Sequence, residues 1–291
     1  MAAVAESPAL VAEDDSFAFV QALATELSSG KVELAGFPDI AARVQRVLSN
    51  EDVSTEKVVQ VLGSEPVLAA QLLSVANSAA LNPSSRAILD LKTAVARVGL
   101  NTVRTATIAY AVRKLRAAEN LQGISKQLET LWQRNVLIAS MSYVVARHAR
   151  VNADSALLTG LLHGVGRLYI LTRAAQHPGL FTNPATYQLI ERDWHLSIAT
   201  ALLENWEVPV EIINAVRDSE DYSREPRGPV SLTDVLVAAN LIAIHSDQPE
   251  FLEVRLQTVR AIAKLGLTRA ICETLVSESA QEIAGLREAL G

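Results

Sequence analysis

The sequence is poor in cysteine and in aromatic residues. Cys272 is the only cysteine among 291 residues, which excludes an internal disulfide and any cysteine-based zinc site and fits a reducing compartment. Phe, Trp and Tyr together make up only 4% of the chain, so the core must consist mainly of Leu, Val, Ile and Ala. So few rings also argue against a surface on which nucleic-acid bases could stack.

An excess of positive charge and long apolar runs are also missing. The formal net charge is −6, which argues against general binding to nucleic acids or anionic membranes. The longest uncharged apolar stretches, 136–146 and 235–244, are too short to cross a bilayer, which takes roughly 20 residues. Residues 1–16 contain acidic but no basic side chains, unlike a signal peptide. We therefore expect a soluble, cytoplasmic protein.

The chain is rich in apolar residues at helical spacing. Hydrophobic residues make up 49% of it, and no segment alternates with the period of two that is typical of a half-buried strand. We expect an all-α, multi-helical fold made of two packed helical halves. Residues 1–15 are predicted to be a flexible tail, 16–118 the N-terminal half, 119–223 the second half, and 224–291 further helices that complete the second half.

Single residues suggest several helix boundaries. Ser16 is a suitable N-cap for the first helix, and Gly99 is a suitable left-handed stop between two helices. Residues 222–229, with two prolines and a glycine, form the clearest linker. Helices in the C-terminal part are predicted near 185–193, 195–205, 209–218, 231–245, 250–264 and 268–289.

The most informative segment is 157–168, Leu-Leu-Thr-Gly-Leu-Leu-His-Gly-Val-Gly-Arg-Leu. An apolar helix ends here in His163, and Gly164 and Gly166 form a sharp corner that points the imidazole inward. The simplest interpretation is a buried histidine that is hydrogen-bonded to the backbone. The segment resembles the His-Asp metal phosphohydrolase superfamily, whose helices end in Leu-Leu-His-Asp-x-Gly-Lys and whose His and Asp both bind a divalent metal.

Other segments make the resemblance more specific. They follow one another along the chain as Phe37-Pro38-Asp39-Ile40, Glu65-Pro66-Val67-Leu68, 72–79, 94–100, Leu131-Trp132 and 203–209. Together with His163 and His195 they resemble the HDOD family, the HD-related output domain of bacterial signalling proteins. The resemblance covers about residues 35–218 and implies that the second half has the helical core of an HD domain.

The metal ligands that this resemblance implies are mostly replaced. The first metal-binding histidine of the superfamily corresponds to Arg134, the metal-bridging aspartate to Gly164, and a late aspartate to Asn240. A histidine pair of the family corresponds to about Ser219-Glu220. A guanidinium is always charged and repels a divalent cation. Only His163 and His195 remain, so we expect no metal, no cofactor and no catalysis.

We therefore interpret the chain as a non-catalytic bacterial signal-transduction or regulatory domain that binds a signalling protein or a small ligand. Arg134 is expected to form a structural ion pair or to bind the carbonyl groups of a helix, or else to hold a phosphate or carboxylate together with Arg167. A homodimer could form through apolar residues near the C-terminus, namely Ile271, Leu275, Ile283, Leu286 and Leu290.

Two other functions stay open at this point. A metal-dependent phosphohydrolase acting on a nucleotide or cyclic dinucleotide would need His163 and His195 together with carboxylates such as Asp154 or Asp193. A DNA-binding regulator could use 91–115 as a helix-turn-helix with Arg104 at the start of its second helix. The net negative charge makes nucleic acid an unlikely partner.

Overall fold

A computed structural model describes residues 8–34, 38–50, 52–84, 86–225, 227–245 and 247–290. These residues form helices and connecting turns, with no strand among them, as the apolar spacing predicts. None of the described helices has the length and apolar character needed to cross a bilayer. The elements are α1 (Pro8–Ser29), α2 (Asp39–Leu48), α3 (Thr55–Gly63), α4 (Pro66–Ala76), α5 (Leu91–Arg116), η1 (Glu119–Ile124), α6 (Ser125–Ala149), α7 (Ala153–Leu162), α8 (Val165–Ala174), η2 (Pro178–Thr182), α9 (Pro184–Asn205), α10 (Val210–Arg217), α11 (Leu232–His245), α12 (Pro249–Thr258), η3 (Arg260–Leu265), α13 (Arg269–Glu278) and α14 (Ala280–Leu290).

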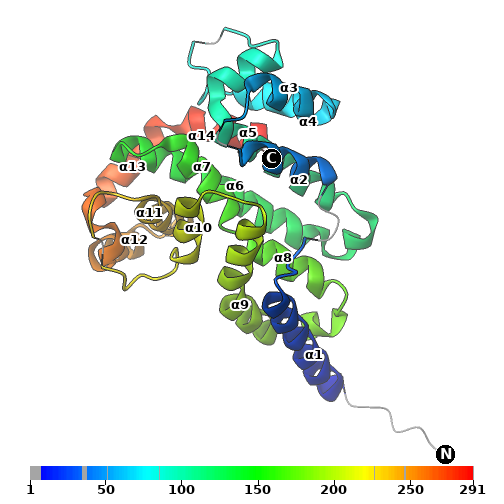
Figure 1. Cartoon of the computed structure of the whole chain (residues 1–291). Helices are drawn as coiled ribbons and strands as arrows, with labels where there is room; N and C mark the ends of the chain where they lie inside the picture. The colour runs from blue at the N-terminus through cyan, green and yellow to red at the C-terminus, as the bar shows by residue number, and fades with distance from the viewer. Residues whose placement is uncertain are drawn as a thin grey trace, which may run out of the picture.

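Helix α6 lies at the centre of the molecule (Figure 1), where α7, α11 and α14 pack against it. Helices α2, α3 and α4 pack against α5, and α5 in turn contacts α7. Helix α14 touches α4, α5 and α6, so the end of the chain lies between the two halves. The buried apolar side chains accordingly form one continuous core that includes residues from both halves.

Helix α5 is kinked at Gly99, which has φ 75° and ψ 169°. The left-handed glycine predicted from the sequence is confirmed, although the helix resumes directly after it. Beyond the kink, Arg104 is only 6% exposed and donates a hydrogen bond to the carbonyl oxygen of Leu48. The helix-turn-helix interpretation is therefore wrong, because the arginine that should read DNA is buried inside the first half.

Helix α1 begins at Pro8, and a start at Ser16 after a tail of 15 residues is wrong; residues 1–7 lie outside the described part of the chain. Proline is well suited to the first turn of a helix. Helix α1 packs against η2 and α9 of the second half (Figure 1). Phe19 and Leu23 are each 1% exposed in this contact. The first helix therefore lies on the second half, away from the helices that follow it in sequence.

Three further predicted boundaries differ from the structure. Two helices were predicted over 185–205, whereas α9 runs without interruption from Pro184 to Asn205. The helix continues because it contains no glycine, and no proline after its first residue. The predicted helix 250–264 changes to a 3-10 helix after Val259, and the predicted helix 268–289 is divided at Ser279.

The apolar stripe near the C-terminus faces the core. Ile283 is 7% exposed, and Leu286 and Leu290 are fully buried against neighbouring helices of the same chain. The prediction that this stripe forms a homodimer contact is therefore wrong for these residues. Cys272 is also buried, on α13, and burial raises the pKa of its thiol to about 11.

The predicted linker 222–229 is attached to the helices around it. Arg224 pairs with the fully buried Asp234 at the start of α11. Lys264 of η3 donates a hydrogen bond to the carbonyl oxygen of Arg227 at 2.9 Å. The chain between α10 and α11 is therefore held in place by charged side chains.

Candidate functional site

His163 ends α7 at the corner that the sequence predicts. Its side chain is 3% exposed, and Nδ1 lies 2.5 Å from the carbonyl oxygen of Gly160. Since a carbonyl can only accept, Nδ1 carries the proton. Burial lowers the pKa of His163 to about 3, and the like charges of Arg167 and Arg134 act in the same direction. The imidazole is therefore neutral at physiological pH.

Position 164 requires a glycine because there is no room for a side chain. The backbone conformation does not require one, since φ is −92°. A Cβ atom at this position would lie 2.6 Å from Cγ of Asn135, which is 3% exposed on α6. The Asn135 amide thus fills the place into which an aspartate at 164 would project. Asn135 is not among the site residues predicted from the sequence, although a polar residue next to Arg134 on a largely apolar helix was a usable signal.

Gly166 brings α8 against α9. A Cβ atom there would lie 2.8 Å from the carbonyl carbon of His195. His195 is fully buried, and its Nδ1 lies 2.8 Å from the carbonyl oxygen of Glu191 within α9. Its Nε2 lies 3.2 Å from Oε1 of Glu220. The corner after His163 therefore holds both remaining histidines in place, each hydrogen-bonded to a backbone carbonyl.

Arg167 is the centre of a charged cluster. Its Nε donates to Glu191 at 3.0 Å and its Nη2 donates to Glu220 at 2.6 Å. Burial by itself would raise the pKa of the Glu220 carboxyl, but hydrogen bonds from His195 and Arg167 outweigh it and lower that pKa to about 2. The cluster connects α8, α9 and the turn after α10. From the sequence, Glu220 was identified only as the place of a missing histidine, and Glu191 was not predicted as a site residue.

The remaining predicted site residues are Arg134 and Asn240. The Arg134 side chain is exposed and makes no ion pair with another described residue, so the expected structural ion pair is absent there. Surrounding protein atoms and the like charge of Arg167 lower its pKa. Asn240 is 3% exposed on α11, and its Oδ1 has no hydrogen-bond partner among the described residues. The structure thus brings His163, Arg134 and Arg167 together with His195, and leaves Asn240 inside the core.

A cavity of about 680 Å³ opens beside the cluster. Its lining comes from α6, from Arg167 and Leu171 of α8, and from η2 and α9. The lining residues are Lys126, Gln127, Thr130, Leu131, Arg134, Arg167, Leu171, Phe181, Pro184, Tyr187, Gln188 and Glu191.

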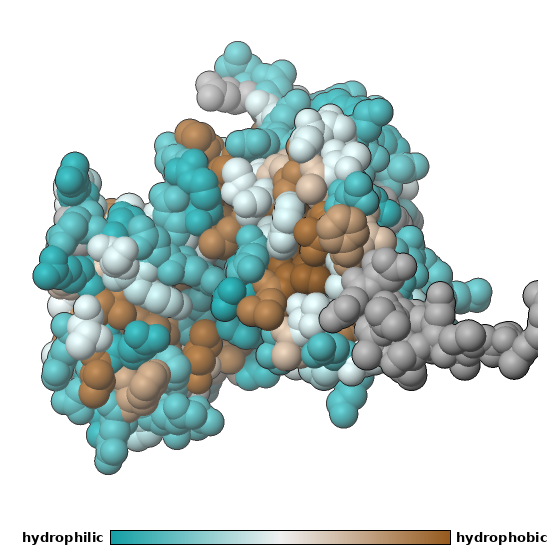
Figure 2. All heavy atoms as spheres, turned by 90° about the horizontal axis from the view of Figure 1, so that it is seen from below, coloured by the Kyte–Doolittle hydropathy of each residue, from teal (hydrophilic) through white to brown (hydrophobic). Residues whose placement is uncertain are grey.

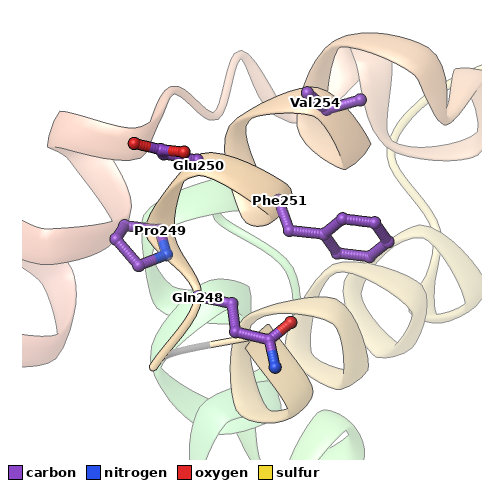
Figure 3. A pocket seen from close by; sticks show the side chains of 5 residues that line it. All are labelled: Gln248, Pro249, Glu250, Phe251 and Val254. Carbon is purple, nitrogen blue, oxygen red and sulfur yellow. The ribbon is translucent and has the colours of Figure 1, made fainter.

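A second hollow of about 500 Å³ lies at the start of α12 (Figure 3). Phe251 lines it, is 46% exposed and contacts His245 edge to face at 4.7 Å between ring centres. Figure 3 shows Glu250 pointing away from Phe251. No charged groups converge on this hollow among its lining residues, so the cavity beside Arg167 is the stronger candidate site.

Apolar surface is also visible at the centre of the face in Figure 2, with hydrophilic surface around it. Large apolar side chains that are exposed include Phe17 of α1, Leu189 of α9, Val210 of α10, and Leu89 in the loop before α5. Scattered exposure of this kind is normal in soluble proteins and does not by itself indicate a binding site.

The residues around His163 do not fit the divalent metal of the His-Asp superfamily. Asn135 occupies the place of the carboxylate, Arg134 brings positive charge, and the oxygen atoms of Glu191 and Glu220 face Arg167. Within the described residues, no group of three or more His, Cys, Asp or Glu side chains could hold a metal ion. Asp193, one of the carboxylates considered for a hydrolase, is exposed and paired with Arg192.

The family that the chain matches covers the same part of the sequence as the motifs described above. The family model of the HDOD domain matches residues 34–222. A protein of Treponema pallidum (strain Nichols), described only as uncharacterized, is 25% identical over 233 residues, which are 75% of this chain and 44% of that protein. The chain thus spans less than half the length of this relative.

Solved structures of bacterial proteins share the fold. A Shewanella amazonensis protein, described as a candidate metal-dependent phosphohydrolase, has a TM-score of 0.75 at 23% identity and covers 96% of this chain and 100% of its own. An HDOD domain protein of unknown function from Geobacter sulfurreducens has a TM-score of 0.62 at 23% identity, covering 92% and 96%. A candidate signal transduction protein from Marinobacter aquaeolei has a TM-score of 0.58 at 19% identity, covering 94% and 65%.

Proposed function

The chain belongs to the HDOD domain family, and from this we propose that it is a regulatory module of bacterial signal transduction that binds a protein or a small ligand without catalysing a reaction. The observation that supports the absence of catalysis is the contact between Gly164 and Asn135. A metal-bridging carboxylate cannot be introduced at 164 unless the buried amide moves.

The charged cluster supports the same proposal. A hydrolase of this superfamily needs carboxylate and imidazole groups that are free to bind metal. Glu191 and Glu220 are instead paired with Arg167, and Nε2 of His195, the nitrogen that could bind a metal, lies 3.2 Å from Oε1 of Glu220. We place the module in the cytoplasm, which is supported by the single, buried Cys272.

Metal content and hydrolysis of the purified chain test the proposal together. The protein is incubated with Mn²⁺, Mg²⁺ or Fe²⁺ and assayed on bis(4-nitrophenyl) phosphate and on a cyclic dinucleotide, and its metal content is measured by mass spectrometry. We expect no hydrolysis above buffer and no stoichiometric metal. Bound metal at about one ion per chain, lost together with phosphodiesterase activity in His163→Ala but retained in the exposed control His148→Ala, would overturn the proposal.

A further inference from the structure

The two sides of the cavity beside Arg167 differ in chemistry. Lys126, Thr130 and Arg134 follow one another at intervals of four residues on α6, so they form one polar stripe along the cavity. Phe181 and Tyr187 lie on the other side, with ring centres 5.5 Å apart and planes inclined at 38°. The cavity therefore has a cationic side and an aromatic side.

Positive charge is in excess around the cavity, where Lys126, Arg134 and Arg167 face two carboxylates. Glu191 and Glu220 form ion pairs with Arg167, and their charge acts on Arg134 without an ion pair. Neither Lys126 nor Arg134 forms an ion pair with a described residue, and both are exposed. In a protein with a net charge of −6, two unpaired cations at the opening of one cavity attract a negatively charged group.

The aromatic side adjoins the charged cluster. Burial and the negative charge of Glu191, the residue that also accepts from Arg167, raise the pKa of the Tyr187 hydroxyl. Phe181 and Tyr187 are both half-buried, so each ring keeps part of its surface open. Leu131 and Leu171 add apolar surface between the two sides. A flat ring placed here would contact aromatic and aliphatic side chains.

We propose that this cavity binds a small organic anion in which a flat aromatic ring is joined to a phosphate or a carboxylate. The anion faces Arg134 and Lys126, and the ring lies against Phe181 and Tyr187. A volume of about 680 Å³ is suited to a ligand of this size. The inference rests on the proposed function, because a hydrolase would cleave the phosphate ester instead of retaining it.

The test is calorimetric titration of the full chain with phenyl phosphate and, separately, phenylacetate. Inorganic phosphate and benzyl alcohol serve as the two halves of the ligand. We expect one or both aryl anions to bind at least about tenfold more tightly than either half, a difference of about 1.4 kcal/mol. The stronger of the two aryl anions identifies the head group as phosphate or carboxylate.

Matched variants locate the site. Arg134→Gln should weaken binding of the preferred aryl anion at least about tenfold, and Phe181→Leu severalfold. Arg192→Gln removes the same charge from an exposed residue that is paired with Asp193 and does not line the cavity, and it should bind like the unchanged protein. Circular dichroism and thermal unfolding verify that each variant is folded.

Two results overturn the inference and leave the proposed function intact. The first is the absence of binding of both aryl anions up to about 10 mM without any hydrolysis. The second is equal binding by the Arg134→Gln and Arg192→Gln variants. Cleavage of phenyl phosphate that depends on metal and on His163 instead overturns the proposed function. These outcomes therefore distinguish an incorrect ligand assignment from an incorrect proposal that the domain is non-catalytic.

Discussion

Gly164 and Asn135 share a small buried space, and neither residue can be changed without regard to the other. The amide occupies the volume that a side chain at 164 would need. In sequence terms Gly164 is a missing ligand, whereas in the structure it is a packing position. Overfilled cores force side chains and backbone to shift, at a cost of typically 1–3 kcal/mol.

We predict that Gly164→Ala lowers the free energy of unfolding by about 2 kcal/mol, because the new methyl group collides with Asn135. Urea denaturation measures the change. Gly123→Ala is the matched control, since a Cβ atom at Gly123 meets no atom within 4 Å, and it should leave stability unchanged or raise it slightly. Equal effects of the two substitutions would contradict the packing role of Gly164.

His163 should make stability depend on pH. Its pKa is about 3 in the folded protein and near 6.5 in the unfolded chain. Below pH 6.5 the unfolded chain therefore binds a proton that the folded protein does not, and stability falls as the pH is lowered through 6.5 towards 3. Between pH 7 and pH 5 the loss should be about 2 kcal/mol.

Urea unfolding of the unchanged protein and of His163→Gln at several pH values between 7 and 5 tests this. The variant starts from a lower stability but should lose much less of it over this window. The carboxyl of Glu220, with a pKa lowered to about 2, contributes only below its ordinary value of 4.5 and stays outside the window. An equally steep pH dependence in both proteins would show that another group is responsible.

At the scale of elements, helix α1 is attached to the second half through a few buried side chains. Phe19 contacts the ring of His177 at 5.3 Å between centres, and Glu26 accepts from Tyr169 and pairs with Arg173. Nothing in the local sequence of 8–29 indicates this partner, since the contact is made with residues about 150 positions away.

We predict that Phe19→Ala releases α1 while the remaining helices stay folded. Truncating a fully buried phenylalanine costs about 3–5 kcal/mol and weakens the packing that Phe19 shares with Val20, Leu23 and Leu27 of the same helix. Hydrogen exchange measured by mass spectrometry should become faster in 15–29 and in η2. Phe17→Ala, at a position that is 71% exposed on the same helix, should exchange like the unchanged protein; if both variants behaved alike, the docking of α1 would not depend on Phe19.

At the scale of the whole molecule, local patterns predicted the class of fold and the corner after His163. The all-α fold, the kink at Gly99 and the family region follow from the spacing of apolar residues and from motifs of a few residues. The filled space at Gly164, the Arg167 cluster and the docking of α1 depend on residues distant in sequence. A single sequence contains no direct record of such pairs, which is why Asn135 and Glu191 were missed.

The placement of α14 has a consequence for anything joined to the ends of the chain. This helix contacts α4 and α5 of the first half as well as α6 of the second, whereas the described contacts of α1 are with η2, α8 and α9 of the second half (Figure 1). A fluorescent reporter or a further domain fused after α14 would transmit strain to the packing between the two halves. The same fusion partner placed before α1 would act on a single helix that docks on the second half. The two ends of the chain therefore differ in how a fusion affects the fold.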